Sequence, residues 1–185
     1  MPTKAYGDAL EACKGHHREH KTFSGKFLRP HAPFIKEIVD RLGCKTILDY
    51  GAGKGRQYEW VNPETGLTME QHWGVEVRKY DPAWPPYAEE PSGKFDLVIC
   101  THTLRCIPLT DLPVIIDRLY SLSGRALYIV ERIGRPKKGL FQSDAFPQWT
   151  PKQWAAAVGG RPGVETHLIC RERGPEGMHL HRFKL

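Results

Sequence analysis

The sequence predicts an α/β protein whose mostly parallel sheet of about six strands is covered by helices on both faces. Apolar runs of strand length alternate with segments whose apolar residues recur at helical spacing, a pattern typical of doubly wound domains. Near the C-terminus, a short polar connection joins two strand candidates, and so short a link permits only an antiparallel hairpin. We therefore expect three layers, α/β/α, that end in an antiparallel pair.

The first predicted helix spans residues 31–42, and Gly43 is a suitable residue for its end. The strand Thr46–Leu48 follows and ends at Asp49, after which glycines stand at alternate positions, Gly51, Gly53 and Gly55. Glycine permits positive φ and lets a ligand approach the backbone without meeting a Cβ atom. The turn could therefore lie beneath a nucleotide-like molecule, and a strand-to-helix turn without a ligand is the alternative.

Two strands and a helix are predicted in the middle of the chain. Phe95–Thr101 and Ala126–Val130 are apolar and rich in β-branched residues, as expected of parallel strands buried on both faces. Between them, apolar residues at Leu109–Leu122 repeat every three or four positions, which predicts a helix with Thr110 or Asp111 as its N-cap.

The last elements are a helix and the hairpin. Thr150–Gln153 reads as a capping box with proline at the first helical position, and the helix should bury Trp154, Ala157 and Val158. Val164–Cys170 and Met178–Leu185 are the two strand candidates of the hairpin.

The run Asp49-Tyr-Gly-Ala-Gly-Lys-Gly55 resembles the first motif of class I S-adenosylmethionine (SAM)-dependent methyltransferases, in particular the small phage-type and bacterial members. Its spacing differs from the G-x-G-x-x-G of dinucleotide-binding domains. In that family the strand-end acid lies near the methionine end of the cofactor, and the chain ends with an antiparallel strand inserted by a hairpin. The resemblance implies a Rossmann-like class I methyltransferase fold with SAM as its cofactor.

A second acid is expected at the end of the next strand, where it would accept hydrogen bonds from the ribose hydroxyls. Asp81 and Glu76 compete for this role. We favour Asp81, because Pro82 ends the strand there and Tyr80–Ala83 resembles the second motif of the small methyltransferases. The alternative interpretation of Glu76 is that it is a strand residue that faces the solvent.

The stretch between Asp81 and Phe95 is too short for the helix, strand and helix that a complete family member has there. Four prolines interrupt it as well. The third-strand region should therefore be truncated, and Trp84 and Tyr87 could supply an aromatic wall for the cofactor.

Cys100–Pro108 stands where the family has its fourth motif, beside the methyl group and the substrate. The Asp/Asn-Pro-Pro-aromatic tetrapeptide of amide N-methyltransferases is absent. His102 could act as a general base, since an unperturbed pKa near 6.5 suits proton removal, and a hydrogen-bonded loop histidine is the alternative. The residues that we expect at the cofactor are Asp49, Tyr50, Gly51, Ala52, Gly53, Lys54, Gly55, Asp81, Thr101 and His102.

We expect a single domain of residues 1–185, with 1–30 as an N-terminal lid and 31–185 as the core. In the small phage-type enzymes the stretch that corresponds to Phe23–Phe27 covers the cofactor. Cys13, His17 and His20 have helical spacing but lack a fourth ligand, so no metal site is predicted.

Composition and charge give the remaining expectations. The five cysteines form no C-x-x-C pair, and no apolar run is long enough to span a membrane, which favours a cytoplasmic protein with reduced thiols. The net charge of +6 is carried by scattered basic residues, apart from a cluster at 132–138. The sequence thus predicts a methyltransferase that acts on a small molecule or a protein. A non-catalytic SAM-binding or regulatory protein is the first alternative, and a nucleic-acid methyltransferase is the second.

Overall fold

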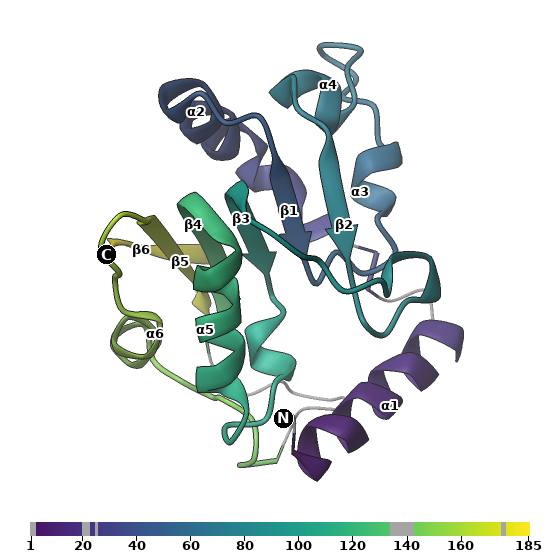
Figure 1. The fold of residues 1–185 in the computed structure, drawn as a ribbon, viewed down its shortest axis with the longest axis vertical. Helices are drawn as coiled ribbons and strands as arrows, with labels where there is room; N and C mark the ends of the chain where they lie inside the picture. Colours follow the sequence, from purple (N-terminus) through teal and green to yellow (C-terminus); the bar gives the residue numbers. More distant parts are fainter. Residues whose placement is uncertain (1–2, 20–22, 25, 134–142, 175–176) are drawn as a thin grey trace.

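The computed structural model describes residues 3–19, 23–24, 26–133, 143–174 and 177–185, and most of the basic cluster at 132–138 lies outside these ranges. Six strands form one sheet in the order β2-β1-β3-β4-β5-β6 (Figure 1). The first five are parallel to one another, and β6 is antiparallel to β5. Their bounds are β1 Ile47–Tyr50, β2 Val77–Tyr80, β3 Phe95–Thr101, β4 Ser123–Arg132, β5 Glu165–Gly174 and β6 Gly177–Lys184.

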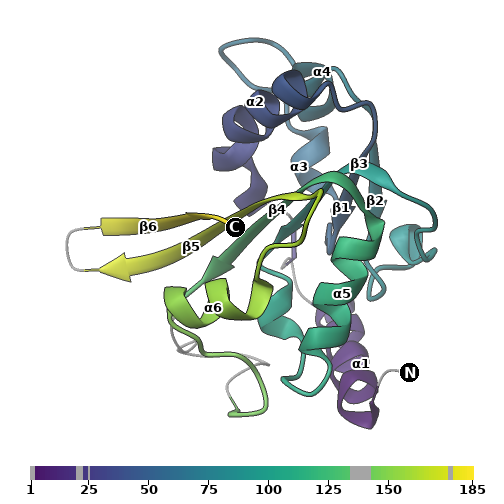
Figure 2. The same cartoon turned by 60° about the vertical axis from the view of Figure 1, so that its left-hand side comes forward.

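Helices cover both faces of this sheet, which confirms the expected α/β architecture (Figures 1 and 2). The longer helices are α1 Lys4–Glu19, α2 Ala32–Leu42, α5 Leu112–Leu122 and α6 Pro151–Val158. The short ones are α3 Arg56–Glu59 and α4 Met69–Trp73, with the 3₁₀ turns η1 Lys26–His31, η2 Pro85–Tyr87 and η3 Leu104–Cys106. Within the described residues, no helix has the length and apolar character needed to cross a bilayer.

Two apolar clusters hold the layers together, one on each face of the sheet. In β3, Leu97 and Ile99 point to the cluster formed with α2, α3 and α4, while Val98 and Cys100 point to the cluster formed with α5 and α6. All four side chains are fully buried. The central strand is apolar throughout because both of its faces meet helices.

The connection between β2 and β3 contains only η2 and turns, so the expected truncation is confirmed. The sheet has six strands because nothing is added beyond β2.

The expected C-terminal antiparallel hairpin is confirmed, but its last strand is not inserted between two others as the family resemblance implies. β5 pairs directly with β4, and β6 lies beyond β5 at the edge of the sheet. Because the Gly174–Gly177 pair closes the hairpin, β6 must lie next to β5, and the only side of β5 left open by β4 is the outer one. The C-terminal order therefore departs from the arrangement that the family resemblance implies.

Two details of the helices also differ from expectation. Asp111 occupies the N-cap position of α5, yet its carboxylate accepts hydrogen bonds from the backbone and hydroxyl of Thr3 and does not cap the helix. In α6, the capping box of Thr150 and Gln153 is present, whereas Ala157 is exposed. Eight residues make little more than two turns, so α6 presents only a narrow stripe to the sheet.

Candidate functional site

Ionisable side chains gather at the carboxyl edge of the parallel strands. Asp49 lies in β1, Asp81 follows β2, His102 follows β3, and Glu131 lies near the end of β4. Asp49 is 1% exposed and Glu131 is fully buried. Carboxyl ends of parallel strands meet at one edge, where open α/β sheets bind their ligands. Glu131 was not among the predicted site residues. The sequence feature that could have indicated it is an acidic residue directly after the apolar run 126–130.

Asp49 lies beneath the glycine turn. Its Oδ2 atom accepts hydrogen bonds from Gln57 Nε2 at 3.0 Å and from the Tyr58 hydroxyl at 2.8 Å. Its Oδ1 atom is buried and has no hydrogen-bond partner in the described part of the chain. Burial raises the pKa of Asp49 to about 7, although the two hydrogen bonds lower it. The carboxyl group therefore keeps one unused acceptor atom at the bottom of the site.

The three glycines of the turn have φ values of +84°, +61° and +66°. A Cβ atom on Gly51 would overlap the side chain of Thr103, and one on Gly53 would overlap the carbonyl of Phe23. A Cβ atom on Gly55 would likewise overlap the ring of Tyr87. The turn thus lies against three other segments of its own chain, and each approach requires glycine.

Phe23 is held on the glycine turn through its backbone. Its carbonyl accepts a 2.8 Å hydrogen bond from the N–H of Lys54, and its φ is +53°. On the other side of the turn, the N–H groups of Gly51 and Ala52 donate to the carbonyl of Tyr80 at 2.8 and 3.0 Å. The turn is therefore fixed to β2 below and covered by Phe23 above.

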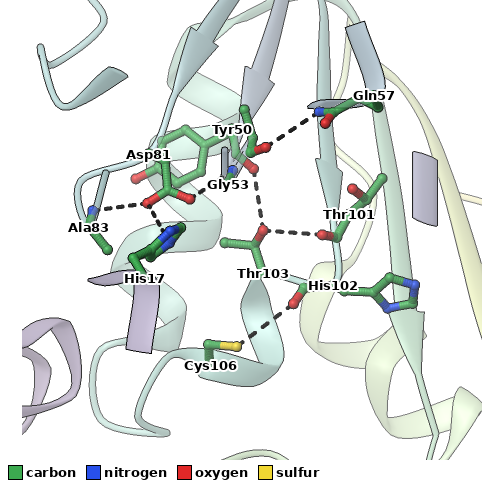
Figure 3. A network of polar contacts seen from close by, with 11 residues as sticks. His17, Tyr50, Gly53, Gln57, Asp81, Ala83, Thr101, His102, Thr103 and Cys106 are labelled. Atoms are coloured by element: carbon green, nitrogen blue, oxygen red, sulfur yellow. Dashed lines mark hydrogen bonds and ion pairs between the residues drawn. The ribbon is translucent and has the colours of Figure 1, made fainter. Parts of the chain in front are cut away.

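Asp81 lies beside the turn, as the sequence predicts (Figure 3). Its Oδ2 atom accepts from the N–H of Gly53 at 2.8 Å, and its Oδ1 atom accepts from the N–H of Ala83 at 2.9 Å. Glu76 is exposed and precedes β2, so it lies at the amino-terminal ends of the parallel strands, away from the glycine turn. Of the two acids that competed for the ribose, Asp81 is the one that the fold brings to the glycines.

His17 of α1 is the second residue that covers this region. Its Nε2 atom lies 3.9 Å from Oδ1 of Asp81, and its ring stacks on Trp84 with centroids 5.5 Å apart. Burial lowers the pKa of His17 and raises that of Asp81, and the attraction between the two groups opposes both shifts. Trp84 thus packs against a histidine of its own chain. We call His17 and Phe23 the covering residues.

Cys13, His17 and His20 were considered as metal ligands from the sequence. His20 lies outside the described residues, and those that are described contain no group of three potential ligands.

Thr103 fills the space between the ends of β1 and β3. Its hydroxyl lies 3.4 Å from the carbonyl of Tyr50 and 3.3 Å from that of Thr101, and can donate to either (Figure 3). The strand order reverses between β1 and β3, which is the point where doubly wound sheets bind their ligands. Nothing in the local sequence distinguished Thr103 from its neighbours, because its position depends on the pairing of distant strands.

His102 points away from Asp81 and the glycines (Figure 3). Its φ is +58°, and both of its ring nitrogens are buried without a hydrogen-bond partner among the described residues. The ring meets Phe27 edge-on, with centroids 4.9 Å apart. Burial and the charges of Arg171, Arg132 and Arg105 lower the pKa of His102 to about 3. The imidazole is neutral at pH 7.

Comparisons of the chain with protein-family models, with curated proteins and with solved structures found no match. The assignment of function therefore depends on the sequence motifs and the geometry of this chain.

The arrangement fits a nucleoside cofactor if the covering residues move. Asp81 already accepts hydrogen bonds at both oxygens, the glycines remove side chains from the turn, and Asp49 has an unused buried oxygen. His17 and Phe23 lie where a ligand at Asp81 and Gly53 would have to enter. Binding at Asp81 and Gly53 must therefore displace the contacts that His17 and Phe23 make there.

Proposed function

We propose that the protein is a SAM-dependent methyltransferase built on a truncated class I methyltransferase-like fold. SAM would be held by the glycine turn and Asp81, and a small-molecule or protein acceptor would bind on the side of His102. The observation that carries this proposal is the 2.8 Å hydrogen bond from the N–H of Gly53 to Asp81, which joins a glycine turn after β1 to an acid after β2. The edge position of β6 is the main departure from the family arrangement.

SAM supplies an electrophilic methyl group on a sulfonium sulfur. The residues of the chain orient the reactants and exclude water, which favours direct displacement. The Asp81 carboxylate would accept hydrogen bonds from two ribose hydroxyls, since it has acceptor sites on both oxygens. His17 and Phe23 would move aside so that the cofactor can reach Asp81 and Gly53.

His102 would accept a proton from the acceptor. In its neutral form one ring nitrogen can accept a proton, and neither ring nitrogen has a partner among the described residues. A pKa of about 3 makes it a weak base in the present conformation, because the arginines nearby disfavour the imidazolium. An acceptor with a negative charge would offset those arginines and raise the pKa of His102 toward the range in which a base is effective.

A non-catalytic SAM-binding or regulatory protein is the second candidate. It is favoured by the direction of the His102 ring, which points away from the glycine turn and Asp81. A nucleic-acid methyltransferase is less favoured, because several exposed or partly exposed arginines already pair with carboxylates. These arginines are Arg41, Arg78, Arg118, Arg125 and Arg161.

Calorimetry with SAM and with its demethylated product tests the proposal. Both ligands should bind and raise the melting temperature, whereas NADH should do neither. Binding of NADH without binding of SAM would reject the family assignment. Incubation with labelled SAM and a broad panel of metabolites, peptides and nucleic acids then separates the enzyme from the binding protein, because only the enzyme yields a labelled product.

A further inference from the structure

A cavity of about 390 Å³ lies between α2 and the β5-β6 hairpin, on the face of the sheet opposite α6. It is separate from the glycine turn and Asp81, neither of which lines it. Pockets of about 300–1,000 Å³ typically bind small molecules. The hairpin that forms one wall extends away from the rest of the sheet (Figure 2).

The strand register explains which side chains face this cavity. Ile169 pairs with Arg182, and Arg171 pairs with Leu180, so these residues share one face of the hairpin. All four line the cavity. Because alternate residues of a strand face the same way, charged and apolar side chains are brought to the same wall.

Positive charge predominates in the lining, which contains four cationic side chains and one acid, Glu37. Arg41 and Lys184 are paired with Glu165 at one end of the cavity. Arg171 and Arg182 have no carboxylate partner within the described residues. Burial and the charge of Arg132 lower the pKa of Arg171. Two guanidinium groups therefore face the cavity without a counter-ion from the part of the chain that the structure describes.

His31, at the start of α2, adds a polar atom without a described partner to the wall opposite the hairpin. It is 3% exposed, and its Nδ1 atom lies 3.0 Å from the hydroxyl of Tyr128. Its Nε2 atom is buried without a partner among the described residues. When Tyr128 donates to Nδ1, the ring proton is on Nε2, where it is available to a ligand. A buried polar atom without a partner is costly, so a ligand that accepts this proton would be stabilised.

Part of the lining is apolar and partly exposed. Phe34, Met178 and Leu180 are 36%, 46% and 44% exposed, and the guanidinium of Arg182 lies 4.3 Å from the ring centre of Phe34. Guanidinium groups match the geometry of carboxylates and stack on flat rings. The cavity thus offers hydrogen-bond donors for an anion and an apolar surface for a flat body.

We propose that this cavity binds an aromatic carboxylate, held by Arg171, Arg182 and His31. The cavity adjoins His102 through Phe27, since Arg171 lies 6.0 Å from the ring centre of Phe27 and the His102 ring meets the same ring. We further infer that this ligand is the methyl acceptor, and this part of the inference rests on the proposed function.

Calorimetry without SAM tests the site by itself, with 2-naphthoate as the probe and 2-naphthamide as its neutral counterpart. The carboxylate should bind at least about 10-fold more tightly than the amide, because charge-assisted hydrogen bonds are stronger than neutral ones. Arg171→Gln and Arg182→Gln should each weaken binding about 10- to 100-fold, and Arg171→Lys should restore part of it. Arg161→Gln is the matched control, since Arg161 pairs with Asp117 and does not line the cavity.

Equal binding of the carboxylate and the amide would overturn the proposal, as would a loss in Arg161→Gln equal to that in Arg171→Gln. Circular dichroism of each variant confirms that the fold is kept. The protein is then incubated with labelled SAM and hydroxylated naphthoates. If they bind in the cavity but remain unmethylated, the cavity is an anion-binding site and is not the site of the methyl acceptor.

Discussion

The carbonyl of Phe23 accepts a 2.8 Å hydrogen bond from the N–H of Lys54, within the glycine turn. Phe23 and His102 are the two non-glycine residues with positive φ in the described part of the chain. Such backbone costs about 1–2 kcal/mol for an ordinary residue, and it persists where the surroundings enforce it. Both residues stand beside the carboxyl edge of the sheet, so the strain is concentrated where the proposed function needs a segment that can move.

Gly53→Ala should release the covering residues. The added Cβ atom would overlap the carbonyl of Phe23, which is backbone and cannot rotate away. We expect faster exchange of the Lys54 amide proton, measured by hydrogen exchange and NMR, because its acceptor must move.

Gly66→Ala is the control for backbone strain. Gly66 has a similar φ of +69°, and a Cβ atom on it would have no neighbour within 4 Å. The two variants should lose comparable stability from strain, of order 1 kcal/mol. If the Lys54 amide proton exchanges as slowly in Gly53→Ala as in the wild type, Phe23 does not hold the turn.

His17→Ala should increase the affinity for SAM by about 3- to 10-fold. In the proposed function, His17 leaves Asp81 before a ribose can bind there, and removal of its side chain lowers the cost of that step. Calorimetry measures the change. His72→Ala is a control histidine on α4, and weaker binding in His17→Ala but not in His72→Ala would indicate that His17 contacts the cofactor.

The sequence was sufficient for the central strands, for three of the longer helices and for the residues at the carboxyl edge. Strand Phe95–Thr101 was predicted with its observed bounds because its apolar run is a local signal. The glycine turn and Asp81 were placed together because parallel strands of one sheet align their ends.

Contacts between distant segments were not predictable in the same way. His17 meets Asp81, and Thr103 meets Tyr50, across long stretches of chain whose arrangement depends on the packed structure. The edge position of β6 also follows from which side of β5 remains open after β4 has paired. Local sequence patterns carry no information on such choices.

Asp49→Asn should change how stability depends on pH. The folded-state pKa of Asp49 is about 7, above the value of about 3.9 for an unfolded chain. Its contribution to stability is therefore complete below about pH 4 and is lost as the pH rises through 7. Asparagine does not ionise, so the variant should gain stability relative to the wild type toward pH 8, by at most about 4 kcal/mol.

Urea unfolding of both proteins at several pH values between 4 and 8 measures this difference. Comparison with the wild type is necessary, because burial also raises the pKa of Glu131, to about 8, and its effect has the same sign. Glu131 is present in both proteins and cancels. A constant difference in the free energy of unfolding across this pH range would show that Asp49 is not buried as a protonated group.

Substitutions of His102 distinguish a methyltransferase from a non-catalytic binding protein. The variant His102→Asn removes the imidazole with little backbone strain. Asparagine tolerates a φ of +58° better than alanine does, so its stability should stay near that of the wild type, whereas His102→Ala should lose about 1 kcal/mol. Because the ring has no hydrogen-bond partner in the described chain, little stability should be lost with the imidazole itself.

If His102 is the base, turnover of the true acceptor should fall by about 10²- to 10⁴-fold in both variants, while the affinity for SAM remains nearly unchanged. A structural role predicts instead that turnover follows stability, so that His102→Asn keeps wild-type turnover and His102→Ala loses turnover only at temperatures where it begins to unfold. Melting curves, calorimetry and initial rates on the same three proteins distinguish these results. Wild-type turnover in His102→Asn would remove the imidazole from the mechanism, because the variant keeps the backbone and lacks only the proton acceptor.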